Sequence, residues 1–171
     1  MQGFIVENGV LTKYEGYDRD ITIPKDVTSI GESAFYSCLT VTTVRIGDQV
    51  SDIGDCAFSD CAALTNIHIP SSVHKIGPYA FYDCTRLYEI TIPEGVECIG
   101  METFAGCTRL STVTIPKSVR EIELMAFALC PNIKRVNYLG SKEDWDKIKI
   151  DLANDDLTSA TRHYIDKKQS I

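Results

Sequence analysis

Five phenylalanines recur at every 23rd residue of this chain, and this spacing constrains the fold more than any other feature. Isoleucine precedes each phenylalanine by five residues and cysteine follows it by three, so whole apolar columns share the period. A fixed period in the twenties, carried by apolar residues, is typical of a solenoid of stacked turns. The columns are Phe35, Phe58, Phe81, Phe104 and Phe127; Ile30, Ile53, Ile76, Ile99 and Ile122; and Cys38, Cys61, Cys84, Cys107 and Cys130.

Each turn opens with alternating apolar and polar residues, as in Ile67, His68 and Ile69, which predicts a half-buried strand. Successive copies of this strand should pair in parallel. A proline such as Pro70 ends the strand, because proline removes a ladder donor. The glycine after the isoleucine column predicts a corner that needs unusual backbone angles. Glu123 replaces that glycine in the fifth turn, so we expect this turn to bend differently.

The two ends of the stack need caps, because exposed apolar surface and unpaired strand edges would remain there. Residues 1–20 contain Asn8-Gly9 between apolar runs, which predicts an N-terminal hairpin. At the other end, Ser141 and Asp144 have the spacing of a helix capping box. The expected organisation is a single domain, 1–171, with an N-terminal cap at 1–20, five repeats at 21–135, and a partial repeat with a C-terminal cap at 136–171.

The C-terminal cap is expected to be a short helix that places Trp145, Ile148 and Leu152 on one face over the last turn. An apolar run at Tyr164 and Ile165 predicts a closing strand, and residues 167–171 are expected to form a loose tail.

Composition excludes several classes of function. The net charge of −7 and the pI near 4.9 argue against nucleic acid as a partner, since such binding needs a basic surface. No apolar stretch has the length of a membrane span, and no export signal is recognised at the N-terminus, so we expect no membrane insertion. Five of the 7 cysteines occupy a repeat column, which favours buried packing over redox chemistry, and no C-x-x-C pair predicts zinc.

The phrase I-x-I-P-x-x-V-x-x-I-G-x-x-A-F-x-x-C-x-x-L, found over residues 21–135, closely resembles the BspA-like, or treponemal-type, leucine-rich repeat family. This resemblance implies a right-handed, curved superhelix rich in β-structure. A parallel sheet would line its concave side, with short strands and single helical turns on the convex side. It also implies a surface or secreted protein that adheres to host or bacterial proteins, although the compartment stays open because no signal peptide is recognised.

We expect a noncatalytic module of protein–protein interaction or adhesion that binds through the outward positions of the first strand of each turn. No pattern indicates a catalytic residue, a metal site or a cofactor. Threonine, tyrosine and mixed charges suit protein or glycan contact, and Thr42, Thr65, Ser111, Lys134 and Asn137 share the face. The candidate partner-binding residues are Thr43, Arg45, Asn66, His68, Tyr88, Glu89, Thr91, Thr112, Thr114 and Arg135.

Two alternatives stay open at this point. The same face could bind a glycan instead of a protein. A more remote alternative is a hydrolase that uses acidic side chains such as Asp60 or Glu89. The identity of the partner and the oligomeric state are not encoded in any motif of this chain.

Overall fold

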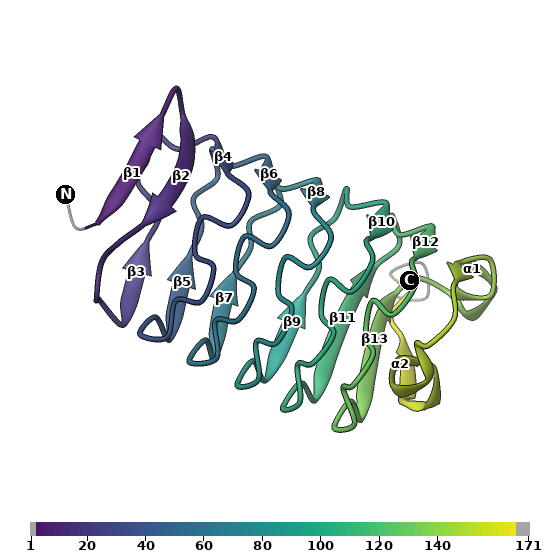
Figure 1. Ribbon diagram of the computed structural model, residues 1–171. Coiled ribbons are helices and arrows are strands. Elements are labelled where there is room, and N and C mark those ends of the chain that lie inside the picture. Colours follow the sequence, from purple (N-terminus) through teal and green to yellow (C-terminus); the bar gives the residue numbers. More distant parts are fainter. Residues whose placement is uncertain (1–2, 167–171) are drawn as a thin grey trace.

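The computed structural model describes residues 3–166, so the expected tail at 167–171 lies outside the described part. The chain forms a solenoid in which each turn contributes strands to two sheets and a segment without strands to a third side (Figure 1). The fold is therefore the leucine-rich repeat solenoid that the resemblance implies. We name its sides the first-strand sheet, the second-strand sheet and the turn side.

The first-strand sheet consists of two hydrogen-bonded parts. One is β3 (Asp20–Thr22), β5 (Thr43–Arg45) and β7 (Asn66–His68), and the other is β9 (Glu89–Thr91), β11 (Thr112–Pro116), β13 (Arg135–Leu139) and β15 (Thr161–Tyr164). The second-strand sheet likewise has two parts. One is β1 (Phe4–Glu7), β2 (Val10–Tyr14), β4 (Ser29–Ile30), β6 (Asp52–Ile53) and β8 (Lys75–Ile76), and the other is β10 (Cys98–Ile99), β12 (Glu121–Ile122) and β14 (Lys149–Ile150). All pairs are parallel except β1 with β2. The turn side consists of residues 31–38, 54–61, 77–84, 100–107 and 123–130.

The phenylalanine column forms the centre of the core. Ring centroids of successive phenylalanines lie 4.7, 5.4, 5.3 and 5.2 Å apart, and the rings are stacked. Each ring is at most 1% exposed. Because a single turn cannot cover its own apolar side chains, each turn completes the burial of its neighbours, and the period in the sequence becomes a continuous core.

A ladder of backbone hydrogen bonds also joins the turns along the turn side. The N–H groups of Ser33, Phe35 and Ser37 donate to carbonyls of the next turn at 2.9, 2.7 and 2.9 Å, and later turns repeat this pattern. The first and last donors of each of the first four turns have positive φ, for example 56° at Ser33 and 55° at Ser37. Every N–H group of this ladder therefore points toward the C-terminal end of the stack.

The corner glycines correct one expectation. Gly31, Gly54, Gly77 and Gly100 do not have positive φ, so unusual backbone angles are not their role. A Cβ at Gly54 would lie 2.7 Å from the backbone nitrogen of Glu32 in the preceding turn. Glycine is therefore needed where one turn packs closely against another.

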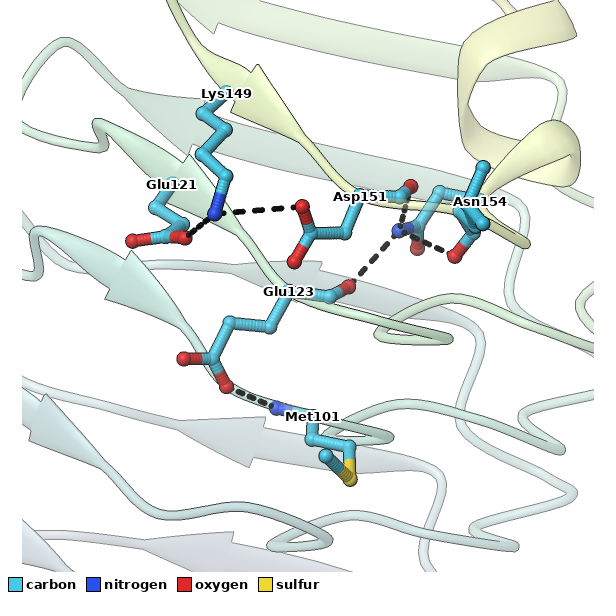
Figure 2. Close-up of polar contacts among 7 residues, drawn as sticks. Met101, Glu121, Glu123, Lys149, Asp151 and Asn154 are labelled. Carbon is cyan, nitrogen blue, oxygen red and sulfur yellow. Dashed lines mark hydrogen bonds and ion pairs between the residues drawn. The ribbon is translucent and has the colours of Figure 1, made fainter.

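The fifth turn does not bend differently, so that expectation is also wrong. Ala126 N–H donates to the carbonyl of Glu123 at 3.2 Å, just as Ala34 N–H donates to the carbonyl of Gly31 at 3.3 Å. The Glu123 side chain points toward the preceding turn, and its Oε2 accepts the N–H of Met101 at 2.8 Å (Figure 2).

The N-terminal hairpin covers the first turn. Asn8 and Gly9 form its turn with φ of 52° and 81°, as expected for an Asn-Gly pair. β2 pairs with β4 and so extends the second-strand sheet. The Tyr14 ring lies 5.2 Å from Phe35 and the Phe4 ring 5.0 Å from Tyr14, which extends the aromatic column by two rings.

The C-terminal cap contains α1 (Lys142–Trp145) and α2 (Asp155–Ser159), followed by β15 as the expected closing strand. The capping box of Ser141 and Asp144 is present, and Trp145 packs against Tyr138 at 5.3 Å. One detail of the expected helix is wrong. α1 ends at Trp145, so Ile148 and Leu152 both lie beyond it. Ile148 still packs against the core, whereas Leu152 is 81% exposed.

The end of the turn-side ladder is completed by cap residues. Met125 N–H donates to the carbonyl of Leu152 at 3.1 Å, Phe127 N–H to Asn154 Oδ1 at 3.0 Å, and Cys130 N–H to Asp156 Oδ2 at 2.8 Å. Asn154 is 2% exposed, and its Nδ2 also donates to the carbonyls of Glu123 and Asp151 (Figure 2). The cap thus supplies the acceptors that another repeat would otherwise supply.

Candidate functional site

We call the surface that carries the outward side chains of the first-strand sheet the first-strand face. Apolar residues of these strands point inward, so residues on either side of them point to solvent. In β7, for example, Ile67 is buried while Asn66 and His68 are exposed. All ten candidate residues are at least partly accessible to solvent.

The strand register arranges nine of the ten candidates in two rows across the face. One row contains Thr43 and Asn66, then Glu89, Thr112 and Arg135. The second contains Arg45 and His68, then Thr91 and Thr114. Parallel pairing places equivalent repeat positions beside each other, and for this reason the period alone identified these rows.

Tyr88 lies one residue before β9 and is 57% exposed. Its side chain lines a separate hollow of about 240 Å³. The sequence identified Tyr88 but not Arg109 or Asn132 beside it. These two residues lie between the cysteine column and the next strand, outside the alternating strand pattern from which the candidates were chosen. The hollow is lined by Tyr88, Arg109, Ser111, Asn132 and Lys134.

The regular pairing is interrupted between the third and fourth turns. Within residues 3–166, no ladder pairs β7 with β9 or β8 with β10, although neighbouring strands on both sides are paired. The turn-side ladder continues there, since Phe81 N–H donates to the carbonyl of Thr103 at 2.8 Å. The two halves of the solenoid are therefore joined mainly along the turn side and through the shared core.

A hollow of about 290 Å³ lies at this interruption on the first-strand face. Ile67 and Ile69 in its floor are each 8% exposed, whereas the equivalent Val44 and Ile46 are 0% and 2% exposed. In the described part of the chain, no ladder joins the backbones of β7 and β9, which would pair in a regular sheet. The hollow is lined by Asn66, Ile67, His68, Ile69, Glu89 and Thr91, four of which are candidates from the sequence.

The cysteine column is structural. Sγ of Cys61, Cys84, Cys107 and Cys130 contacts the phenylalanine carbonyl of the preceding turn at 3.1, 3.2, 3.3 and 3.1 Å. Burial raises the pKa of Cys61 and of Cys130 to about 12, so these thiols are not reactive nucleophiles. Burial likewise raises the pKa of the partly exposed Cys98 to about 11, with the charge of Glu123 as the second cause.

The histidine and acidic side chains that could serve catalysis are distributed over different sides of the solenoid. His68 and His163 lie on the first-strand face, whereas His74 precedes β8 on another side. Asp60 is on the turn side and Glu89 on the first-strand face, so these two carboxylates do not share a site. In the described residues, no group of three or more His, Cys, Asp or Glu is placed to hold a metal ion. Among the helices of residues 3–166, none has the length and apolar character needed to cross a membrane.

The chain matches a family described as the BspA type leucine rich repeat region, in 6 copies over residues 14–134. The match begins at Tyr14, the residue that extends the aromatic column beyond the first phenylalanine. No curated protein matches the chain in a sequence comparison.

Several solved structures are similar to this chain. A leucine rich cell surface protein from Faecalibacterium prausnitzii A2-165 is 35% identical, with a TM-score of 0.80 over 83% of this chain and 38% of that protein. A leucine rich repeat protein from T. pallidum is 28% identical, with a TM-score of 0.69 over 75% of this chain and 62% of that protein. The pneumococcal vaccine antigen PcpA, 19% identical with a TM-score of 0.68 over 95% of this chain and 45% of that protein, shares the fold. The chain thus spans less than two thirds of each of these proteins.

Proposed function

The chain belongs to the BspA type leucine-rich repeat family, and from this premise we propose that it is a noncatalytic module that binds a protein partner through its first-strand face. Leucine-rich repeat solenoids are generally interaction modules, and the similar Faecalibacterium protein is described as a cell surface protein. We extend both properties to this chain, as an adhesion or recognition module of a bacterial surface protein. We also propose that its single domain comprises residues 1–171.

The hollow between β7 and β9 is the observation that carries this proposal. It combines apolar floor residues, an imidazole at His68, a carboxylate at Glu89, and strand backbone that lacks its regular pairing. A bound polypeptide segment can satisfy these backbone groups and place a side chain on Ile67 and Ile69. The flanking rows, with Arg45 on one side and Arg135 on the other, supply further polar contacts.

The proposal is tested by replacing Arg45, His68, Tyr88 and Glu89 together with alanine. Immobilised protein would capture partners from host and bacterial lysates, with bound proteins identified by mass spectrometry. We expect partners held by the unaltered chain to be lost from the variant, because central aromatic and charged side chains dominate binding energy. A matched control replaces exposed Lys25, Tyr36, His74 and Glu97, which lie on other sides of the solenoid, and should retain the partners. Retention by the first variant and loss by the control would move the site away from the first-strand face.

Glycan binding is the second candidate, and the hollow at Tyr88 favours it. An exposed aromatic ring beside Arg109, Ser111, Asn132 and Lys134 presents a stacking surface together with several hydrogen-bonding groups. A glycan array probed with the chain and with Tyr88→Ala tests this alternative. Signals that disappear in Tyr88→Ala would favour a glycan ligand, and an array without signals would leave the protein partner as the only supported ligand.

A further inference from the structure

Several outward positions of the turn side change from polar to apolar toward the C-terminal end of the solenoid, although Tyr36 of the first turn is also 57% exposed. In the first and second turns its outward positions hold residues such as Glu32, Ser37, Asp55 and Asp60. In the later turns and the cap, equivalent positions hold large apolar side chains that remain in solvent. We call these residues the apolar patch: Met101, Leu124, Met125, Leu129 and Leu152, which are 37%, 36%, 38%, 71% and 81% exposed.

Burial in the core does not account for these exposed side chains. Met125 and Leu129 have φ of 58° and 55°, the left-handed angles that the equivalent residues adopt in every turn. The position of Leu129 is occupied by Asp60, Asp83 and Gly106 in the preceding turns, so the fold accepts polar residues or glycine there. An exposed leucine at a position where the fold accepts aspartate, serine or glycine brings no evident gain in stability, and a group of exposed apolar side chains points to a function.

The patch borders a pocket of about 430 Å³ whose charged lining is entirely acidic in the described residues. Glu102, Asp155 and Asp156 line it, together with Tyr82, Met125 and Leu129. The negative charge extends along the turn side to Asp83, whose charge, followed by burial and by Glu102, raises the pKa of Tyr82. Apolar surface and acidic groups therefore occur together, away from the first-strand face.

We propose that the apolar patch is a second docking surface, and that its occupant is a protein segment presenting apolar side chains flanked by lysine or arginine. The apolar side chains of that segment would cover Leu129 and Leu152, and its cations would face Glu102 and Asp155. A second copy of this chain fits less well, because two patches face to face would bring their carboxylates together. Burial of the patch by a partner would account for the exposed apolar side chains at positions that are polar or glycine in other turns.

Titration of the whole chain with two synthetic amphipathic helices, each about 18 residues long, tests the proposal. One helix is built from leucine and lysine, and the other replaces every lysine with glutamate. Calorimetry at low salt should show binding of the leucine–lysine helix and an affinity at least about tenfold lower for the leucine–glutamate helix. Added salt should weaken the first interaction, since its charges are exposed.

The double variant Leu129→Gly and Leu152→Ser should bind the leucine–lysine helix at least about tenfold more weakly. This variant should still fold, because glycine accepts the left-handed angle of residue 129 and residue 152 contributes its backbone carbonyl to the ladder. Leu39→Ser, at a residue that is 65% exposed outside the patch, is the matched control and should bind normally. The alanine variant of the first-strand face should also bind normally, so the two surfaces can fail independently.

Three results would overturn the proposal. The first is equal binding of both helices, which would remove the role of charge, and the second is no binding of the leucine–lysine helix. The third is self-association of the chain in sedimentation velocity that the double variant abolishes, which would assign the patch to a second copy.

Discussion

Asn154 is expected to be the most sensitive polar residue of the C-terminal cap, because its side chain replaces the backbone of a further turn. Its Oδ1 accepts the N–H of Phe127 at 3.0 Å. Its Nδ2 donates to the carbonyls of Glu123 at 2.9 Å and Asp151 at 3.0 Å (Figure 2). Asn154→Ala removes all three bonds and leaves a buried backbone N–H group without a partner at the end of the ladder.

The magnitude follows from these contacts. A buried donor left unsatisfied costs about 1–3 kcal/mol, and each lost hydrogen bond contributes about 1 kcal/mol. We therefore expect Asn154→Ala to lower the free energy of unfolding by about 3 kcal/mol. For a domain of this size such a change lowers Tm by about 6–12 °C. Asn154→Asp keeps the acceptor for Phe127 but loses the two donors, so its loss should be smaller.

Urea unfolding followed by circular dichroism would measure the loss, and hydrogen exchange at the Phe127 amide would locate it. Asn132→Ala is the matched control, because Asn132 also donates to a backbone carbonyl, that of Thr108 at 2.7 Å, but is exposed. Its substitution should cost about 1 kcal/mol or less. Equal losses in the two alanine variants, or unchanged protection of the Phe127 amide in Asn154→Ala, would refute the replacement of a turn by this side chain.

Three further predictions concern the repeats and the cap. Gly54→Ala should lower the free energy of unfolding by about 1–3 kcal/mol, because its Cβ would lie 2.7 Å from backbone of the preceding turn. Gly100→Ala should lower it less, since the nearest atom there is 3.4 Å away, and equal urea midpoints of the two variants would contradict the packing role of Gly54. The four fully buried cysteines of the column should resist a thiol reagent at pH 8 in the folded chain and react only after unfolding. Rapid labelling of all 7 thiols in the folded chain would disprove their burial. The hydrogen bond from Lys117 holds the pKa of Asp144 below its usual 3.8, so the stability that this pair supplies is present above pH 3.8 and lost as the pH falls further. Tm should therefore drop more steeply below pH 4 in the unaltered chain than in Asp144→Asn, and parallel curves of Tm against pH would refute this linkage.

Much of the fold could be predicted because the information is periodic and local. The phenylalanine column predicted a stack of rings, and the rings lie in contact from Phe35 to Phe127. The capping box at Ser141 and the Asn8-Gly9 turn were also recognisable, because each depends on residues close in the sequence. The reason for the corner glycines could not be predicted from the sequence, because the atoms that a Cβ would meet belong to the preceding turn.

The candidate site was predicted in part. Alternation within each first strand identified the outward rows, including His68 and Glu89. The interruption between β7 and β9 could not be predicted, because the third and fourth turns carry the same apolar pattern as their neighbours. Arg109 and Asn132 were missed for a similar reason, since they reach Tyr88 only after the turns are stacked.

The amino-acid sequence by itself determined the period, the buried columns and the face that each strand residue occupies, because side chains alternate across a strand and identical turns must stack to bury their apolar residues. Only the tertiary structure decided where neighbouring turns separate, that Asn154 completes the ladder of the last turn, and that Leu129 and Leu152 remain exposed. These features depend on distances between turns, and a repeat pattern fixes the order of the turns without fixing the spacing between any two of them.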